Sequence, residues 1–244
     1  TIVLRTFASV ALLSFQLNAA PLLLSGDLNK DLSLTNLAIN KKFEGTNEYL
    51  SVAQYQLSYA DGYHSKPFRD VFDRNLFIKK FEEYINPKVK KWDAAGLIND
   101  VTTKYDEVVV YGLDNLIPMP PLLNRQGGIW YQLKRYELEM AQILGRVSVV
   151  SGYHVNDGDS VYFKILVNEE NATTISYLMS ERDSNSNLSY YITSISCIES
   201  LIERDVFAKE HPVISTANNS AAQSPFIWTS GGKEPHKCRL SESE

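Results

Sequence analysis

Residues 108–137 read VVVYGLDNLIPMPPLLNRQGGIWYQLKRYE, and this stretch decides how the rest of the chain is interpreted. It opens with an apolar, β-branched run over residues 108–113, which predicts a buried strand. The prolines that follow predict a turn, and the Asn-Arg-Gln-Gly-Gly loop then leads into an amphipathic helix that begins near Ile129. A loop of this kind directs the side chain of Asn124 at whatever lies before the helix.

The same stretch resembles a segment of the DNA/RNA non-specific endonucleases, the ββα-metal (His-Me finger) family that includes endonuclease G-like proteins. That segment reads as a strand, then N-I-x-P-Q, and then l-N-x-G-x-W-x-x-L-E. The matching positions in this chain are Asn115, Leu116, Ile117, Pro118, Leu123, Asn124, Gly127 or Gly128, Trp130 and Leu133. Because these matches fall in the family's order, they form a fairly specific signal.

Later segments follow the family's order as well. Residues 145–152 (GRVSVVSG), 162–165 (YFKI) and 188–207 (LSYYITSISCIESLIERDVF) resemble its later strands and closing helix. The resemblance covers about residues 50–210. It implies an α+β fold, with a central antiparallel sheet flanked by helices and a ββα-metal (His-Me finger) type site.

Hydrophobic periodicity predicts the individual elements of this fold. The expected strands are residues 52–59, 147–150, 161–167 and 190–196, with a short connection over 155–160. The expected helices are residues 68–84, 129–144 and 198–207. In the second of these helices, we interpret Trp130 as a core anchor rather than a platform for base stacking.

The chain departs from the family at the catalytic motif. Active members carry s-G-y-D-R-G-H upstream, where the His is the general base, and the later Asn holds Mg²⁺ together with waters and the scissile phosphate. The best match is residues 92–98, WDAAGLI, which places Ala95 at the family Arg and Leu97 at the family His. By resemblance, Asn124 is the metal residue and lies across from Leu97. Leucine cannot take a proton, so no catalytic residue is intact.

A second departure lies in the helix, where Lys134 replaces an acidic residue of the family. Two unit charges about 4 Å apart interact by about 4 kcal/mol at an effective dielectric near 20, so this exchange should weaken Mg²⁺ binding. A lysine there could instead reach a phosphate. The residues expected to contact nucleic acid are Asn115, Arg125, Lys134 and Arg135.

Other residues could supply the missing chemistry. His64 is the alternative general base, although it falls where the resemblance places an early strand and its turn. Asp93 and Asp106 are candidate replacement acids, but aspartates beside turns are more often helix caps or solvated residues.

The ends of the chain differ in composition from its middle. Residues 1–20 resemble a secretory signal peptide, with a positive charge at Arg5, an apolar run and a small-residue end. That run is too short to span a bilayer, which needs about 20 apolar residues, so we expect no transmembrane segment. Residues 21–210 are then the endonuclease-like domain, and residues 211–244 a polar, flexible tail.

Secretion agrees with two further features. Cys197 and Cys238 either pair in an oxidising compartment or are unrelated thiols. Three sequons for N-glycosylation begin at Asn171, Asn187 and Asn218.

The formal net charge of −5 argues against a protein covered in positive charge, because polyanion binding relies on Lys and Arg. A local basic face remains possible. The candidate clusters are Lys79 with Lys80, Lys88 with Lys90 and Lys91, and Arg125 with Lys134 and Arg135.

Three functional hypotheses follow. The first is a secreted, catalytically impaired nuclease-like protein that binds DNA or RNA without sequence specificity. The second is an active Mg²⁺-dependent endonuclease with a displaced base. The third is a protein-interaction module that retains only the fold. Family resemblance also implies a possible homodimer.

Overall fold

A computed structural model describes residues 38–42, 49–55, 72–98, 113, 115–144, 147–156, 158–168 and 173–207. In the first two ranges the description covers the backbone alone. Several sequence predictions lie outside the described residues. They concern the signal peptide, the strand at 108–112, His64, Asp106, Asn171, Cys238, Asn218 and the polar tail.

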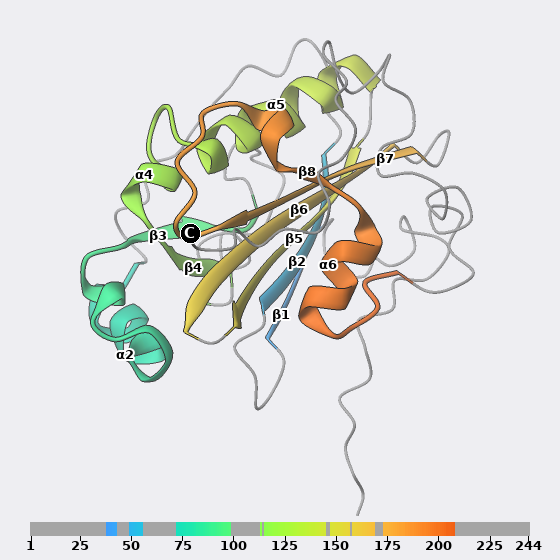
Figure 1. Ribbon diagram of the computed structural model, residues 1–244. Helices are drawn as coiled ribbons and strands as arrows, with labels where there is room; N and C mark the ends of the chain where they lie inside the picture. The colour runs from blue at the N-terminus through green and yellow to red at the C-terminus, as the bar shows by residue number, and fades with distance from the viewer. Residues whose placement is uncertain are drawn as a thin grey trace, which may run out of the picture.

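The main sheet has six strands, and every neighbouring pair is antiparallel. Its spatial order is β1-β2-β5-β6-β7-β8 (Figure 1). The strands are β1 (Ala38–Lys42), β2 (Tyr49–Tyr55), β5 (Val147–Asn156), β6 (Asp159–Asn168), β7 (Thr173–Ser180) and β8 (Ile192–Thr193). A separate two-stranded sheet contains β3 (Asp93–Gly96) and β4 (Leu116–Met119).

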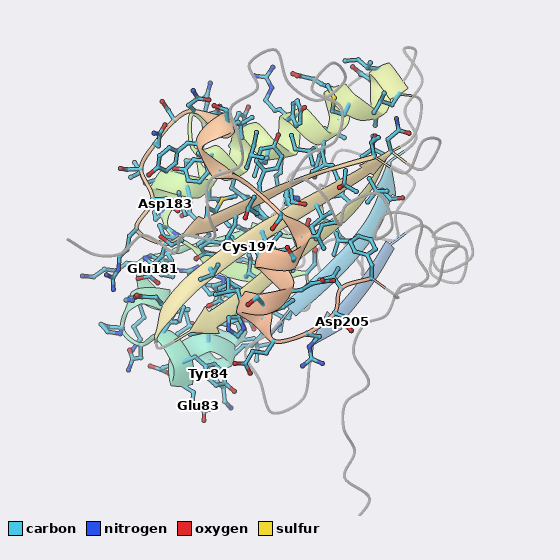
Figure 2. The ribbon with its side chains drawn as sticks, turned by 45° about the vertical axis from the view of Figure 1, so that its right-hand side comes forward. Glu83, Tyr84, Glu181, Asp183, Cys197 and Asp205 are labelled. Carbon is cyan, nitrogen blue, oxygen red and sulfur yellow. The ribbon has the colours of Figure 1, made fainter. Side chains whose placement is uncertain are left out.

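Helices accompany both sheets, so the predicted α+β class is confirmed at this coarse level. They are α2 (Arg74–Ile85), η1 (Lys88–Lys90), α4 (Pro121–Asn124), α5 (Ile129–Leu144), η2 (Leu188–Tyr191) and α6 (Ile195–Ile202). Figures 1 and 2 show α5 and α6 packed from different sides of the main sheet. Among the described helices, none has the length and apolar character needed to cross a bilayer.

The register of the sheet separates two buried faces. Val149, Leu166 and Ile175 are cross-strand neighbours and belong to the core that also contains α2, α5 and the β3–β4 hairpin. On the other face, Phe163 pairs with Gly152, and its ring fills the space that a Cβ at Gly152 would need. Because side chains alternate along a strand, Phe163 and Leu166 face opposite sides of the sheet.

Helix α5 has the bounds that the sequence predicted. Its apolar stripe recurs at helical spacing and buries Trp130, Leu133 and Ala141 completely. Trp130 is therefore a core residue, as expected. This stripe carries one feature that periodicity did not predict, because Glu137 lies within it and is also completely buried.

Helix α2 begins later than predicted. The side chain of Asp73 accepts hydrogen bonds from the backbone N–H groups of Asn75 and Leu76 at 2.8 and 3.2 Å. An N-cap of this kind fixes the first turn, so the helix starts at Arg74 rather than at residue 68. Its buried face is Phe77, Phe81 and Ile85.

Two sequence predictions near the C-terminal half are wrong. The expected strand at 190–196 is instead η2, the two-residue β8 and the start of α6, because Asn187 and Ser194 cap those two helices. The expected connection at 155–160 is mostly strand, since β5 and β6 continue their pairing as far as Asn156 and Asp159.

Candidate functional site

The β3–β4 hairpin precedes α4 and α5 in sequence, so the chain order at the candidate site is strand, strand, helix. Ala94 pairs with Pro118, which lies inside β4 although the prolines had predicted a turn. Proline cannot donate to a ladder, but each strand of a two-stranded sheet has one unpaired edge where it is tolerated. The Pro118 carbonyl accepts a hydrogen bond from the Tyr162 hydroxyl at 2.8 Å and so connects the hairpin to the main sheet.

Asn115 closes one end of the hairpin, which we call the closed end. Its backbone carbonyl accepts from the Leu97 N–H at 2.9 Å, and its side-chain oxygen accepts from the Ile98 N–H at 2.8 Å. Asn115 is completely buried. Its carboxamide therefore serves the hairpin itself and does not lie on the surface, where a nucleic acid could contact it.

The residues at the family's Arg and His positions are also in the core. Leu97 has no exposed surface and Ala95 has almost none. The Leu97 side chain packs among apolar residues, while its carbonyl oxygen accepts a hydrogen bond from Lys164 Nζ at 3.1 Å. The position of the expected general base is thus apolar and closed to water.

Lys164, on β6, is buried completely beneath this closed end. Besides the Leu97 carbonyl, its ammonium donates to Glu137 Oε2 at 3.0 Å and to Ser151 Oγ at 2.9 Å. These three acceptors satisfy its three N–H groups. The ammonium also lies 4.6 Å from the ring centroid of Trp130. Burial lowers the pKa of Lys164, the Glu137 carboxylate opposes that effect, and the charge of Lys134 adds to the lowering.

Lys134 and Trp130 approach the hairpin from α5. The Trp130 indole donates from Nε1 to the Gly96 carbonyl at 3.2 Å. A Cβ at Gly96 would stand 2.9 Å from the Ile98 carbonyl and 3.6 Å from Lys134 Nζ. The hairpin therefore needs glycine here, and the Lys134 ammonium is directed toward the hairpin backbone.

Asp93 marks the other end of β3, which we call the open end. Arg125 donates to its carboxylate from Nε at 3.0 Å and from Nη2 at 2.9 Å, and Asn124 Nδ2 donates at 3.3 Å. Burial opposes ionisation of Asp93, but the hydrogen bonds from Arg125 and Asn124 outweigh it and hold its pKa below the ordinary value. The same carboxylate raises the pKa of Arg125.

Asn124 and Leu97, which the family resemblance places across from each other, lie at opposite ends of the hairpin. Asn124 contacts Asp93, whereas Leu97 follows the last residue of β3. Four residues of strand extend about 13 Å at roughly 3.3 Å each. The expectation that Asn124 lies across from Leu97 is therefore wrong for this structure, because the β3–β4 register places them at opposite ends.

The groups around Asn124 do not suit Mg²⁺. A hard cation needs several oxygen ligands, and the carboxylate that Asn124 contacts is that of Asp93. Both of its oxygens already bind the Arg125 guanidinium, whose positive charge opposes a second cation at the same place. Throughout the described ranges, no group of three or more His, Cys, Asp or Glu side chains is placed to hold a metal.

At least four of the eight residues in the predicted basic clusters pair with acids. Arg125 pairs with Asp93, and the remaining pairs are Lys88 with Glu181, Lys90 with Glu82, and Arg135 with Glu139. The ammonium of Lys80 donates to the Leu113 carbonyl. Each carboxylate lowers the local positive potential that a phosphate would experience.

A pocket of about 370 Å³ lies beside the open end. Its walls are the α4–α5 connection, including Leu122, Arg125 and Gly127, and the segment 183–186. Gln132 joins the two walls by donating to the carbonyls of Gly127 and Ser186 at 3.0 and 3.2 Å. The volume is within the range of small-molecule sites.

Sequence reasoning missed Glu137 and Lys164, although a signal for both was present. Glu137 interrupts the apolar stripe of α5, and Lys164 interrupts the apolar run VYFKILV at 161–167. A buried charge on each of two core faces destabilises the fold unless the two charges pair. Opposite signs at these positions could have predicted the contact.

No protein-family model matches the chain, and no curated protein matches it. The resemblance to the DNA/RNA non-specific endonucleases therefore depends on the motifs and their order alone.

Proposed function

We propose that the protein is a nuclease-like binding protein that has lost phosphodiester hydrolysis and binds nucleic acid at the open end of the hairpin. The observation that carries the loss of catalysis is the burial of Leu97 at the position of the expected base. A positioned general base contributes about 10²- to 10⁴-fold to a rate, and a leucine side chain contributes none of it.

The neighbouring charges support the same conclusion. The Lys164 ammonium occupies the space beneath the closed end, and the Lys134 ammonium faces Gly96 from α5. Glu137 already balances the charge of Lys164, but the ammonium of Lys134, at a position where the family has an acidic residue, disfavours a nearby cation, so a metal-activated water is not expected there.

The open end provides the more suitable surface for a phosphate backbone. The side chain of Arg125 is 70% exposed, and Lys91, in the turn leading to Asp93, is also exposed. Arg125 donates hydrogen bonds to Asp93 from Nε and Nη2, so its Nη1 does not bind that carboxylate. A phosphate that binds Arg125 would compete with Asp93, so affinity should be modest and should fall as salt rises.

The test combines cleavage and binding on one preparation of the full chain. Plasmid DNA and RNA are incubated with Mg²⁺ and with EDTA, and a gel-shift titration is carried out at low and high salt. We expect no metal-dependent cutting and a salt-sensitive shift that Arg125→Ala weakens. The control is Arg204→Ala, which removes one arginine from the turn that follows α6. Metal-dependent cutting that Asn124→Ala abolishes would overturn the proposal.

A second candidate is a protein-interaction module that binds no nucleic acid. The specific observation in its favour is the pairing of Lys88, Lys90, Arg125 and Arg135 with carboxylates of the same chain. It predicts that no gel shift occurs at either salt concentration. The same titration therefore distinguishes the two candidates.

A further inference from the structure

The segment between β7 and η2 carries the sequence Asn187-Leu188-Ser189. Of the three sequons in the chain, this is the one that lies within the described residues. Figure 2 shows Glu181 and Asp183 at the outer edge of the molecule, where the chain leaves β7 to enter this segment. Residues 184–187 are all exposed. An acceptor asparagine must lie on such a surface, because the glycan that it carries is large and hydrated.

The geometry of Asn187 leaves its nitrogen available. The side-chain oxygen accepts from the backbone N–H of Ser189 at 3.0 Å and from its hydroxyl at 2.8 Å. This arrangement caps η2. Among the described residues, Nδ2 donates no hydrogen bond, so a substituent on that nitrogen displaces no internal contact. The folded protein is thus compatible with a sugar at Nδ2.

An independent observation concerns the compartment. Cys197, on the buried side of α6, is disulfide-bonded. Disulfides persist mainly in proteins that fold in the endoplasmic reticulum, the periplasm or outside the cell, and are rare in the cytosol. In eukaryotes, the compartment that forms such bonds also transfers glycans to sequons. Figure 2 shows Cys197 on the helix that follows the sequon in the chain.

We propose that Asn187 is a site of N-glycosylation. The donor is an oligosaccharide linked through pyrophosphate to a membrane lipid. The Asn187 nitrogen forms a bond to C1 of the first sugar, the bond from C1 to the pyrophosphate oxygen breaks, and the nitrogen loses one proton. The lipid pyrophosphate is the leaving group, and no oxidation or reduction occurs.

The position of the glycan has a consequence for binding. Asn185 and Ser186 line the pocket beside the open end, and Asn187 follows them directly. A glycan on Asn187 therefore stands at the rim of that pocket. A macromolecule that binds Arg125 must approach from the side away from the 183–187 segment.

The experiment expresses the full chain behind a cleavable secretion signal in a eukaryotic cell that performs N-glycosylation. The secreted protein is treated with a peptide N-glycosidase in heavy-oxygen water and analysed by peptide mass spectrometry. We expect Asn187 to be converted to heavy-labelled aspartate. Recovery of the Asn187 peptide as unlabelled asparagine from secreted, folded protein would overturn the proposal.

Matched variants separate glycosylation from folding. Asn187→Asp keeps the oxygen that caps Ser189 but removes the acceptor nitrogen, and Ser189→Thr keeps the sequon. We expect the first variant to lose the glycosidase-sensitive mobility shift that Asn187 contributes and the second to retain it. Ser189→Ala should lose the shift as well. If Asn187→Asp retains the full wild-type shift while circular dichroism reports an unchanged fold, the shift arises at another sequon and the proposal fails.

Discussion

The two ends of the β3–β4 hairpin each carry an ion pair of almost the same length, but the two pairs differ in exposure. At the closed end, Lys164 and Glu137 are 3.0 Å apart and neither side chain is exposed. At the open end, Arg125 and Asp93 are 2.9 Å apart, with side chains 70% and 20% exposed. Distance alone would give these pairs the same role, whereas burial gives them different ones.

Burial decides the energetics because water cannot hydrate a buried charged group that has lost its partner. The Lys164 ammonium has no solvent to replace a lost carboxylate, so removing one partner leaves an uncompensated charge in the core. The Arg125 guanidinium can exchange its carboxylate for water or for another anion at little cost. The closed end is therefore structural, and the open end is where a ligand can compete.

The largest expected effect comes from the closed end. Glu137→Leu should lower the free energy of unfolding by about 3–5 kcal/mol, because it leaves the Lys164 ammonium buried without its carboxylate. The measurement is urea denaturation followed by circular dichroism. The double variant Glu137→Leu/Lys164→Met removes both charges and should recover most of the loss. A double variant as unstable as the single one would show that packing, and not the unpaired charge, causes the destabilisation.

Asn115 should show the next largest effect. Asn115→Leu keeps the volume of the side chain but removes the oxygen that accepts from the Ile98 N–H. Leaving that buried donor without a partner costs about 1–3 kcal/mol. Asn115→Asp retains an acceptor oxygen but buries a charge, so it should be at least as destabilising near neutral pH and should recover in acid as the carboxyl protonates. An Asn115→Leu variant with wild-type stability would place the closing hydrogen bond elsewhere.

The contrast between the ends also explains how far the sequence predicts the site. Local signals were sufficient for α5 and for the core position of Trp130, because apolar periodicity specifies both, whereas the α+β class was implied by the family resemblance. The relation of Leu97 to Asn124 was not predictable, since it depends on the register of β3 against β4. Register is set by tertiary contacts such as Tyr162 to Pro118, which no short motif encodes.

A smaller effect is expected for the contact between the sheet and the hairpin. Tyr162→Phe removes the hydroxyl that donates to the Pro118 carbonyl at 2.8 Å while keeping the buried ring. We expect a loss of about 1 kcal/mol in the free energy of unfolding, measured in urea, which is typical of one intramolecular hydrogen bond. Tyr136→Phe is a control on α5, because it removes a tyrosine hydroxyl whose hydrogen bond is to Tyr177 of the main sheet. Protection of the hairpin amides from hydrogen exchange should fall only in the Tyr162 variant.

The smallest effect on stability is expected for Arg125→Ala, and it should depend on pH. Asp93 has a pKa below its ordinary value of 3.8 in the folded protein, so its contribution is present above the unfolded pKa and is lost as pH falls through the folded pKa. Without Arg125, burial opposes ionisation with less compensation, and the pKa of Asp93 should rise.

This rise can be followed by NMR titration of the Asp93 carboxyl carbon in the wild-type protein and in Arg125→Ala. The difference in stability between the two proteins should be greatest near neutral pH. It should disappear in acid, where Asp93 is protonated in both. Arg182→Ala breaks the comparable exposed pair with Asp159 and should leave the Asp93 titration unchanged. An Asp93 pKa that does not respond to Arg125→Ala would mean that Asn124 and water, rather than Arg125, hold the carboxylate, and a phosphate at Arg125 would then meet no competition from Asp93.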